Sequence, residues 1–263
     1  MKREYSFTIQ YVLLIMLYVS FSSCKKASTD EEAILQEQCN KLAALKAHPF
    51  TSVVKGAQID IAADSLEGAF YYWTGPGSFE SYYQNNTVTT NADYSDRGWY
   101  YVRMSVNGCN DHIDSIYVNV TFPQGTPGCT ASDNSATFSG SLFLGDQAFS
   151  FISFGNVSSG YQVDGNSSNG DISLRFSEYW LTHDFEDGVY YTTSNSSIDY
   201  AAIDKIFISD VNQGIYWVAD PDKPVYISHV GSKQRITFCG IQFSGSNGGP
   251  LYHTTVNAKI TQP

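Results

Sequence analysis

From Pro49 to the C-terminus, the sequence is a series of short runs in which apolar and polar side chains alternate. The run "AQIDIAAD" places Ile59 and Ile61 on one side of a strand, and "DISLRFSE" repeats the pattern further along the chain. An apolar residue at every second position is typical of a half-buried β-strand. The 19 Tyr residues and the low charged fraction of 16% are also typical of secreted β proteins. The sequence therefore predicts an all-β fold.

Turn and linker residues divide this β region into two predicted domains. Residues 49–122 contain several strand-length runs separated by turn signals such as Asn107-Gly108, which indicates one β-sandwich. Residues 123–128, in "TFPQGTPG", combine Pro and Gly without apolar periodicity and are predicted to be a linker. Residues 129–263 hold nine strand candidates, enough for a larger β-sandwich or flattened barrel. In "RITFCGIQF" the alternation changes phase at Cys239-Gly240, which predicts a β-bulge.

One short helix is predicted before the β region. The segment "TDEEAILQEQCNKLAALKAH" begins with Thr29, and Glu32 follows three residues later, which is the pattern of a capping box. The apolar residues of the segment lie at helical spacing, namely Ile34, Leu35, Leu42 and Leu45. We therefore assign residues 24–48 to a tether and a short helix. Cys39 in the middle of the helix favours packing on the next domain over a free stalk.

The first 23 residues have the order of a secretory signal peptide. Lys2 and Arg3 precede the apolar run "YVLLIMLYVSF", and small polar residues lead into Cys24. This run is shorter than the roughly 20 residues that span a bilayer. The stretch "FSSC" resembles a bacterial lipobox, which implies that residues 1–23 are removed and that Cys24 carries a lipid anchor. The alternative is an ordinary signal peptide with an unrelated cysteine.

The tract after Cys24, "KKASTDEE", is similar to the export signal of lipoproteins on the outer face of the outer membrane in Bacteroidota. That resemblance implies an outer-membrane, lipid-anchored protein that is exposed at the cell surface. A solvated linker is the alternative. Removing residues 1–23 leaves 13 basic and 25 acidic residues, a net charge of −12, because Lys2, Arg3 and Glu4 are lost. An acidic surface repels phosphate backbones, so nucleic acid is not an expected partner.

Four cysteines remain once Cys24 is assigned to the lipid, and a secreted protein is expected to pair them. They are Cys39, Cys109, Cys129 and Cys239, and no two of them form a C-x-x-C motif. Four cysteines allow three pairings. The spacing of the residues does not choose among these pairings.

The first predicted domain resembles the immunoglobulin fold. Asp96, Gly98 and Tyr100 reproduce its D-x-G-x-Y corner, and Trp73 in "YYWTGPGSF" matches the tryptophan at the centre of the sandwich. The usual disulfide of the family would fall near Ile61 and at Val102, which are both apolar here. The resemblance therefore implies an Ig-like, PKD-like domain whose centre is held by packing alone.

The stretch "YYWTGPGSF … GWYYVRMSVNGC" is similar to modules of Bacteroidota surface proteins, which often pair a cysteine at the position of Val54 with one like Cys109. Because Val54 cannot form that bond, the resemblance implies a Cys39–Cys109 pair. Cys129 and Cys239 then remain to close the second domain. That second domain resembles uncharacterised C-terminal β domains of Bacteroidota lipoproteins, for which no site is implied.

The sequence contains no catalytic or cofactor motif of a common enzyme class, so we expect a protein that is not an enzyme and has no cofactor. Two acidic stretches bear some likeness to calcium loops, but neither completes the EF-hand pattern. Short Asp, Asn and Gly runs between strands are ordinary turn residues, so no metal site is predicted. If a metal is bound, calcium at these loops is the first candidate. Their acidic and amide residues are Asp184, Glu186 and Asp187 in "HDFEDG" and Asp210 and Asn212 in "DVNQG".

Two Tyr-Trp pairs are candidate ligand-binding residues, namely Tyr179-Trp180 and Tyr216-Trp217. Within a strand, one residue of each pair faces away from the core, where it could stack on a sugar. Packing in the core or over neighbouring strands is the alternative. The predicted function is a non-catalytic envelope lipoprotein for surface interaction or adhesion, with a glycan or protein as its ligand. The alternative is a glycan-binding accessory of a polysaccharide uptake system.

Overall fold

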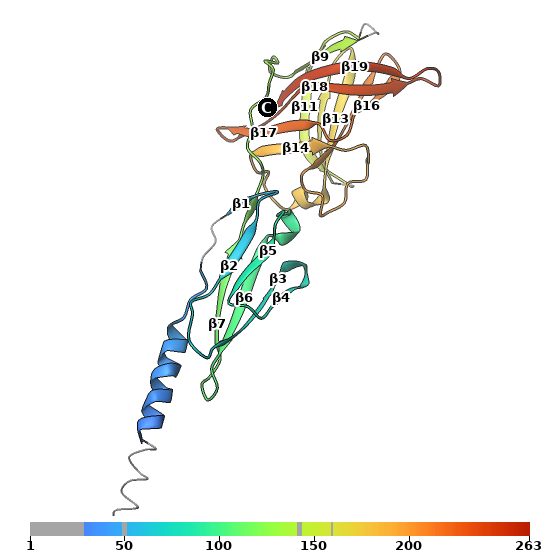
Figure 1. Ribbon diagram of the computed structural model, residues 1–263. Helices are drawn as coiled ribbons and strands as arrows, with labels where there is room; N and C mark the ends of the chain where they lie inside the picture. The colour runs from blue at the N-terminus through green and yellow to red at the C-terminus, as the bar shows by residue number, and fades with distance from the viewer. Residues whose placement is uncertain (1–28, 49–51, 141–143, 159) are drawn as a thin grey trace, which may run out of the picture. The chain divides into compact units, whose positions relative to one another are not determined.

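The computed structural model describes residues 29–48, 52–140, 144–158 and 160–263 (Figure 1). The predicted signal peptide and Cys24 lie outside the described residues. The chain divides into two compact units. The first unit is Met1–Ala92 with Asp96–Asn119, and the second is Asp93–Ser95 with Val120–Pro263. Both units are built of β-strands, which confirms the predicted all-β fold.

The described elements are one helix, three short 3-10 helices and nineteen strands. The helix covers residues 29–44. The elements of the first unit are β1 (Val53–Val54), β2 (Ile59–Ala62), β3 (Phe70–Gly75), η1 (Pro76–Ser78), β4 (Phe79–Ser81), β5 (Asn85–Thr89), β6 (Gly98–Ser105) and β7 (His112–Val118). η2 (Tyr94–Asp96) begins in the short segment Asp93–Ser95, which is assigned to the second unit, and ends at Asp96, where the first unit resumes. The remaining elements are β8 (Val120–Thr121), β9 (Ser135–Gly140), β10 (Gln147–Ala148), β11 (Phe151–Val157), β12 (Gly160–Asn166), β13 (Gly170–Phe176), η3 (Glu178–Leu181), β14 (Gly188–Thr192), β15 (Lys205–Asn212), β16 (Ile215–Ala219), β17 (Pro224–Val230), β18 (Lys233–Ser246) and β19 (Tyr252–Thr261).

The first unit contains two antiparallel sheets, β2-β5 and β4-β3-β6-β7. Alternate residues of β2, β3 and β6 are buried, as the period of two predicts. Trp73 of β3 has no exposed surface and lies opposite Val102 of β6. Ile61 is buried as well, so apolar side chains fill the centre where an Ig disulfide would lie. This small sandwich confirms the fold that the sequence predicts for the region.

The predicted tyrosine corner is present. The hydroxyl group of Tyr100 donates a hydrogen bond of 3.0 Å to the backbone oxygen of Asp96, four residues upstream. The Tyr100 ring lies where a side chain at Gly75 would be, because a Cβ added to Gly75 would overlap the ring. The abrupt Gly75-Pro76-Gly77 break in "YYWTGPG" therefore serves packing: it makes room for the buried ring of Tyr100.

The helix is attached to the first unit. Cys39 forms a disulfide with Cys109, as predicted, and Leu42 is fully buried. A Cβ at Gly108 would lie 3.2 Å from the side chain of Leu35. Ile34, which the helical pattern includes in the apolar face, is 60% exposed. Among the described residues, no helix combines the length and apolar character needed to cross a bilayer.

The second unit is one large sheet with the order β10-β9-β19-β18-β17-β14-β15-β13-β12-β11. β16 pairs with both β15 and β18, so the strands β15, β16, β18, β17 and β14 form a closed circuit. β14 and β15 pair in parallel, whereas the other pairs are antiparallel. The flattened barrel predicted for this region is consistent with that closure. The sequence did not predict β12, because Gly and polar residues interrupt its apolar alternation.

Two further predictions for the second unit are confirmed. The pairing of β18 with β19 shifts register between Phe238 and Ile241, and Gly240 between them has a φ of +65°. This is the predicted β-bulge, and glycine adopts such a φ without strain. Cys129 and Cys239 form the second predicted disulfide.

The start of the predicted linker is hydrogen-bonded to the second unit. The backbone N–H of Val189 donates to the oxygen of Pro123 at 2.8 Å. Gln124 donates through Nε2 to the backbone oxygen of Asp187 at 2.9 Å. A Cβ at Gly125 would lie 2.9 Å from Val189. Residues 123–125 are therefore packed on β14.

Candidate functional site

Both tryptophans of the predicted Tyr-Trp pairs are buried, which corrects the prediction that they could stack on a sugar. Trp217 in β16 is 0% exposed and Trp180 is 3% exposed. Trp180 lies in the 3-10 helix η3 rather than in a strand, and its Nε1 donates to the backbone oxygen of Ile203 at 2.9 Å. The strand rule for alternating faces therefore did not apply to "SEYWLTHDF", although it did apply to β16.

The two tyrosines of these pairs are more accessible. Tyr216 is 51% exposed on the outer side of β16. Tyr179 is half-buried, and its ring stacks on the imidazole of His183 with 3.9 Å between centroids. The structure does not bring Tyr216 and Tyr179 into one site.

A cavity of about 680 Å³ lies in the second unit, beside the segment that follows η3. We name it the second-unit cavity. Its lining residues come from β11, β12, η3 and the loop after it, β17, the β17–β18 turn, the start of β18 and the segment after β19. They are Asn156, Tyr161, Trp180, Leu181, Thr182, His183, Asp184, Phe185, His229, Ser232, Gln234 and Gln262. The segment "SEYWLTHDF", which contains the predicted pair Tyr179-Trp180, thus lines the second-unit cavity, but through Trp180 and the residues after it and not through Tyr179.

Aromatic rings form one wall of the second-unit cavity. Phe185 stacks on Trp180 with 4.5 Å between centroids and an interplanar angle of 9°. The rings of Tyr161 and Phe185 pack edge to face, with 5.0 Å between their centroids. Burial raises the pKa of the Tyr161 hydroxyl, which keeps it protonated at neutral pH. The wall is therefore apolar and rigid, with a hydroxyl group in its neutral form.

The remaining lining of the second-unit cavity is polar. Gln234 is only 5% exposed, and its Nε2 has no hydrogen-bond partner among the described residues. His183 Nδ1 lies 2.9 Å from the backbone oxygen of Tyr179. His229 Nδ1 lies 2.6 Å from Oδ1 of Asp187. Since a carbonyl or carboxylate oxygen only accepts, each Nδ1 is the donor in these contacts. In a neutral imidazole Nε2 is then an acceptor, and in an imidazolium it is a second donor.

The acidic side chains of the two stretches are not clustered in the described part of the chain. No three His, Cys, Asp or Glu side chains there lie close enough together to hold a metal ion. Asp187 is paired with His229, and Asp184 lines the second-unit cavity. Asp210 and Asn212, predicted to lie in a turn, are instead buried in β15, and only Gln213 and Gly214 form the turn.

The first unit has an exposed aromatic surface that the sequence analysis did not single out. We name it the outer aromatic face and define it by Tyr72 of β3, Trp99 and Tyr101 of β6, Tyr117 of β7 and Tyr82 after β4. Trp99 is 52% exposed and lies opposite Tyr117 in the β6–β7 register. Their ring centroids are 5.4 Å apart, and those of Trp99 and Tyr101 are 6.5 Å apart.

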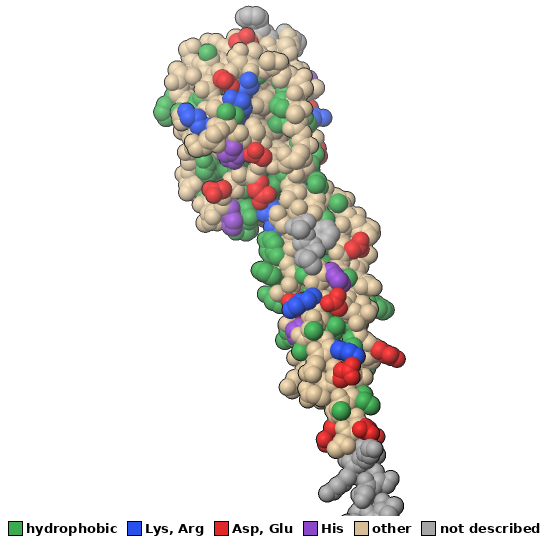
Figure 2. Space-filling model, turned by 90° about the vertical axis from the view of Figure 1, so that its left-hand side faces the viewer, with side chains coloured by type: hydrophobic (Ala, Val, Ile, Leu, Met, Phe, Trp, Pro, Cys, Tyr) green, Lys and Arg blue, Asp and Glu red, His purple; other side chains and the backbone are tan. Residues whose placement is uncertain are grey.

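The other half of the outer aromatic face combines rings with a cation. The ring centroids of Tyr72 and Tyr82 are 5.0 Å apart, and Tyr82 is 72% exposed. The guanidinium group of Arg103 lies 5.6 Å from the Tyr72 ring centre. The signal for this face was present in "GWYYVRMS": if Tyr100, Val102 and Met104 point inward, the residues between them point outward. Figure 2 shows one face of the molecule, on which hydrophobic side chains reach the surface in scattered groups among charged side chains and His.

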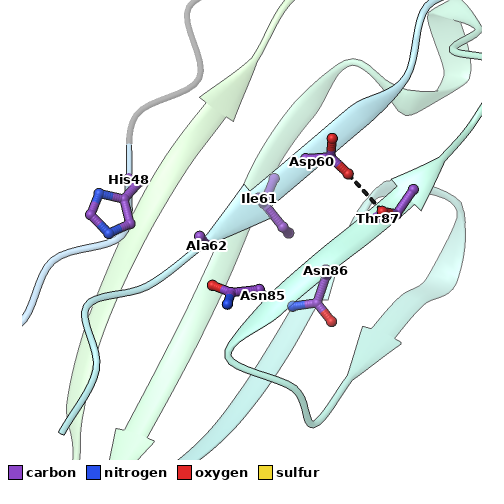
Figure 3. Close-up of a pocket in the computed structure, with 7 residues that line it drawn as sticks. All are labelled: His48, Asp60, Ile61, Ala62, Asn85, Asn86 and Thr87. Atoms are coloured by element: carbon purple, nitrogen blue, oxygen red, sulfur yellow. Dashed lines mark hydrogen bonds between the residues drawn. The ribbon is translucent and has the colours of Figure 1, made fainter.

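A shallow groove of about 320 Å³ lies along β2 and β5 of the first unit (Figure 3). Asp60 in this groove accepts hydrogen bonds from Thr87 Oγ1 at 2.6 Å and from Gln58 Nε2 at 2.7 Å. These bonds lower the pKa of Asp60, that from Thr87 most. His48 at the other end is paired with Asp64 rather than with Asp60. Among the described residues that line the groove, Asp60 and His48 are therefore not paired with each other.

Neither a protein-family model nor a curated protein matches the chain. Among solved structures, the chain is similar to Drosophila OTK, extracellular domains 3-5, with a TM-score of 0.22 and 8% identity. That similarity covers 82% of this chain and 96% of the other. A likeness of this degree supports no conclusion about function.

Proposed function

We propose that this protein is a lipid-anchored, non-catalytic binding protein of the bacterial outer membrane that holds a glycan chain on the outer aromatic face of its first unit. The observation that carries the proposal is the exposure of this face. Three of its rings, those of Trp99, Tyr101 and Tyr117, are between 42% and 52% exposed although they adjoin one another. Contiguous apolar surface of this kind on a soluble unit marks an interaction site.

The chemistry of the rings favours a carbohydrate. A pyranose ring has an apolar face of C–H groups and a rim of hydroxyl groups, which matches an aromatic body with a polar tip. The rings are held by their strands and by one another, so binding costs little side-chain entropy. Thr74 and Ser115 flank Tyr101 in the sheet register and provide neutral hydrogen-bonding groups beside the rings.

The proposed location rests on the N-terminal sequence. The apolar run before Cys24 and the tract "KKASTDEE" support an anchor at Cys24 and export to the outer membrane. Two or more acyl chains anchor a protein stably, whereas a single chain binds only marginally. A tethered protein with an exposed aromatic face would retain glycan at the cell surface.

A protein ligand is the second candidate, and Arg103 favours it. Tyr, Trp and Arg are the residue types most enriched at the energetic centres of protein interfaces. Arg103 lies between Tyr72 and Ile113 in the sheet register, beside the rings of the outer aromatic face. An adhesive contact with another protein would use the same surface.

The proposal is tested by affinity electrophoresis of the full-length chain through gels that contain soluble polysaccharides. We expect at least one polysaccharide to retard the protein, and the double substitution Trp99→Ala with Tyr101→Ala to remove the retardation. Tyr216→Ala is the matched control, because it deletes an exposed tyrosine of the second unit. The glycan proposal fails if no polysaccharide retards the chain or if the double variant is retarded as strongly as the wild type.

A further inference from the structure

We propose that the second-unit cavity is a separate binding site for a neutral mono- or disaccharide. This inference goes beyond the function proposed above, because it concerns the other unit, a different set of residues and a small ligand. Its volume of about 680 Å³ lies within the roughly 300–1,000 Å³ of typical small-molecule sites.

Gln234 is the residue that marks the second-unit cavity as a binding site. Its side chain is 95% buried, since 5% is exposed, yet its Nε2 donates to no group of the described protein. A buried donor without a partner costs free energy, so one is retained in a fold chiefly where something accepts from it. The backbone of Gln234 is fixed from both directions: its N–H donates to Gln262 Oε1 at 3.3 Å, and its carbonyl accepts from the Gln262 N–H at 2.8 Å. These two bonds hold the backbone of Gln234, which lines the cavity, in place on β18.

The two imidazoles supply acceptors. Their Nδ1 atoms are engaged by Tyr179 and Asp187, which leaves Nε2 of each ring to accept a hydrogen bond when the ring is neutral. Asn156 and Gln262 add side-chain amides, each of which can donate and accept. A ligand that meets these groups must carry several groups that both donate and accept, and hydroxyl groups are of this type.

The charge of the second-unit cavity favours a neutral ligand over an anionic one. Asp184 is the only carboxylate that lines it, and the described lining contains no Lys or Arg. A phosphate or carboxylate would meet a like charge without a Lys or Arg side chain to offset it. The stacked rings of Trp180 and Phe185 offer an apolar wall to one face of the ligand. A neutral sugar, with hydroxyl groups at its rim and C–H groups on its face, satisfies both conditions.

Calorimetric titration of the full-length chain in a zwitterionic detergent tests the inference. The neutral probes are glucose, galactose, N-acetylglucosamine, maltose and cellobiose, and the anionic counterparts are glucuronate and glucose 6-phosphate. We expect at least one neutral probe to bind and both anions to bind more weakly. Gln234→Leu should weaken binding by about tenfold, the effect of losing one buried hydrogen bond.

Two further variants keep the test independent of folding and of the proposed glycan chain site. Ser232→Trp places a bulky ring at an exposed turn position of the cavity and should abolish binding without disturbing the core. Gln242→Leu, at an exposed position of the same strand outside the cavity, should leave affinity unchanged. Trp99→Ala with Tyr101→Ala should also leave it unchanged, which separates the two sites. The inference is overturned if no neutral probe binds, if the anions bind more tightly, or if Gln234→Leu and Ser232→Trp both retain wild-type affinity.

Discussion

Trp217 of β16 lies directly opposite Asp210 of β15, and both side chains are buried in the second unit. Gln147 donates to Asp210 Oδ1 at 2.8 Å, whereas Asp210 Oδ2 and Trp217 Nε1 have no partner among the described residues. Burial raises the pKa of Asp210 to about 7, and the hydrogen bond from Gln147 only partly opposes this shift. The interior of the second unit thus contains a carboxyl group that ionises near neutral pH.

Asp210 should make the second unit less stable as the pH rises from about 4 to about 7. In this range the folded protein binds a proton that the unfolded chain, with a carboxyl pKa of 3.8, has released. The free energy of unfolding therefore falls with pH, by at most about 1.4 kcal/mol per pH unit for one proton. Urea unfolding from pH 4 to pH 8, followed by tryptophan fluorescence, measures the slope.

Asp210→Asn should remove this contribution and should leave the protein more stable than the wild type above pH 7. Asp222→Asn is a control of opposite sign, because a hydrogen bond from Lys205 lowers the pKa of Asp222. The contribution of Asp222 is present above its unfolded pKa and is lost as the pH falls. Equal slopes in the wild type and in Asp210→Asn would show that Asp210 does not titrate in this window.

Tyr100→Phe should destabilise the first unit by about 1 kcal/mol, the usual net contribution of one hydrogen bond. The substitution removes the bond to the Asp96 oxygen and keeps the buried ring. Burial, and next the charge of Asp96, raise the pKa of the Tyr100 hydroxyl to about 12, so the group remains a donor at neutral pH. Calorimetry should show a lower melting temperature for the first unit only. Tyr101→Phe, at the adjacent exposed position, should have no comparable effect.

Each disulfide should stabilise the unit that contains it. Cys39–Cys109 and Cys129–Cys239 close segments of 70 and 110 residues, for which chain entropy predicts about 4 to 5 kcal/mol each. Replacing Cys129 and Cys239 by Ser should lower the melting transition of the second unit in calorimetry. The paired substitution of Cys39 and Cys109 should act on the first unit instead. A shift of both transitions by either pair would contradict this division.

Gly240→Ala should destabilise the second unit by roughly 1–2 kcal/mol, the cost of a left-handed backbone for a residue with a Cβ. Gly240 has a φ of +65°, and no atom lies within 4 Å of an added Cβ, so the whole effect is conformational. Gly155→Ala is the matched control, because its Cβ also meets nothing and its φ is not positive. A comparison of urea midpoints separates the two variants. If Gly240→Ala and Gly155→Ala had the same urea midpoint, alanine would cause no backbone strain at the bulge.

Features that depend on neighbouring residues in the sequence were predicted correctly. The tyrosine corner, the central burial of Trp73 and the bulge at Gly240 each follow from a local pattern of residues. The prediction of the ligand-binding residues was less successful. The pattern in "SEYWLTHDF" did not show that Trp180 lies in a 3-10 helix, where the alternation of strands does not apply. β12 was missed because Gly and polar residues fill much of a strand that is stabilised by its two neighbours.

By itself, the sequence determined that the chain is all-β, where many of its strands and turns fall, and which faces of those strands are apolar, because backbone conformation and side-chain alternation are local properties. Only the tertiary structure decided which outward aromatics adjoin one another, that Gln234 is buried without a partner beside a cavity, and that Asp210 ionises in the core. These features depend on strand order and register, which bring together residues that are distant in the chain. Trp99 and Tyr117 became neighbours through the pairing of β6 with β7, and Asp210 and Trp217 through that of β15 with β16.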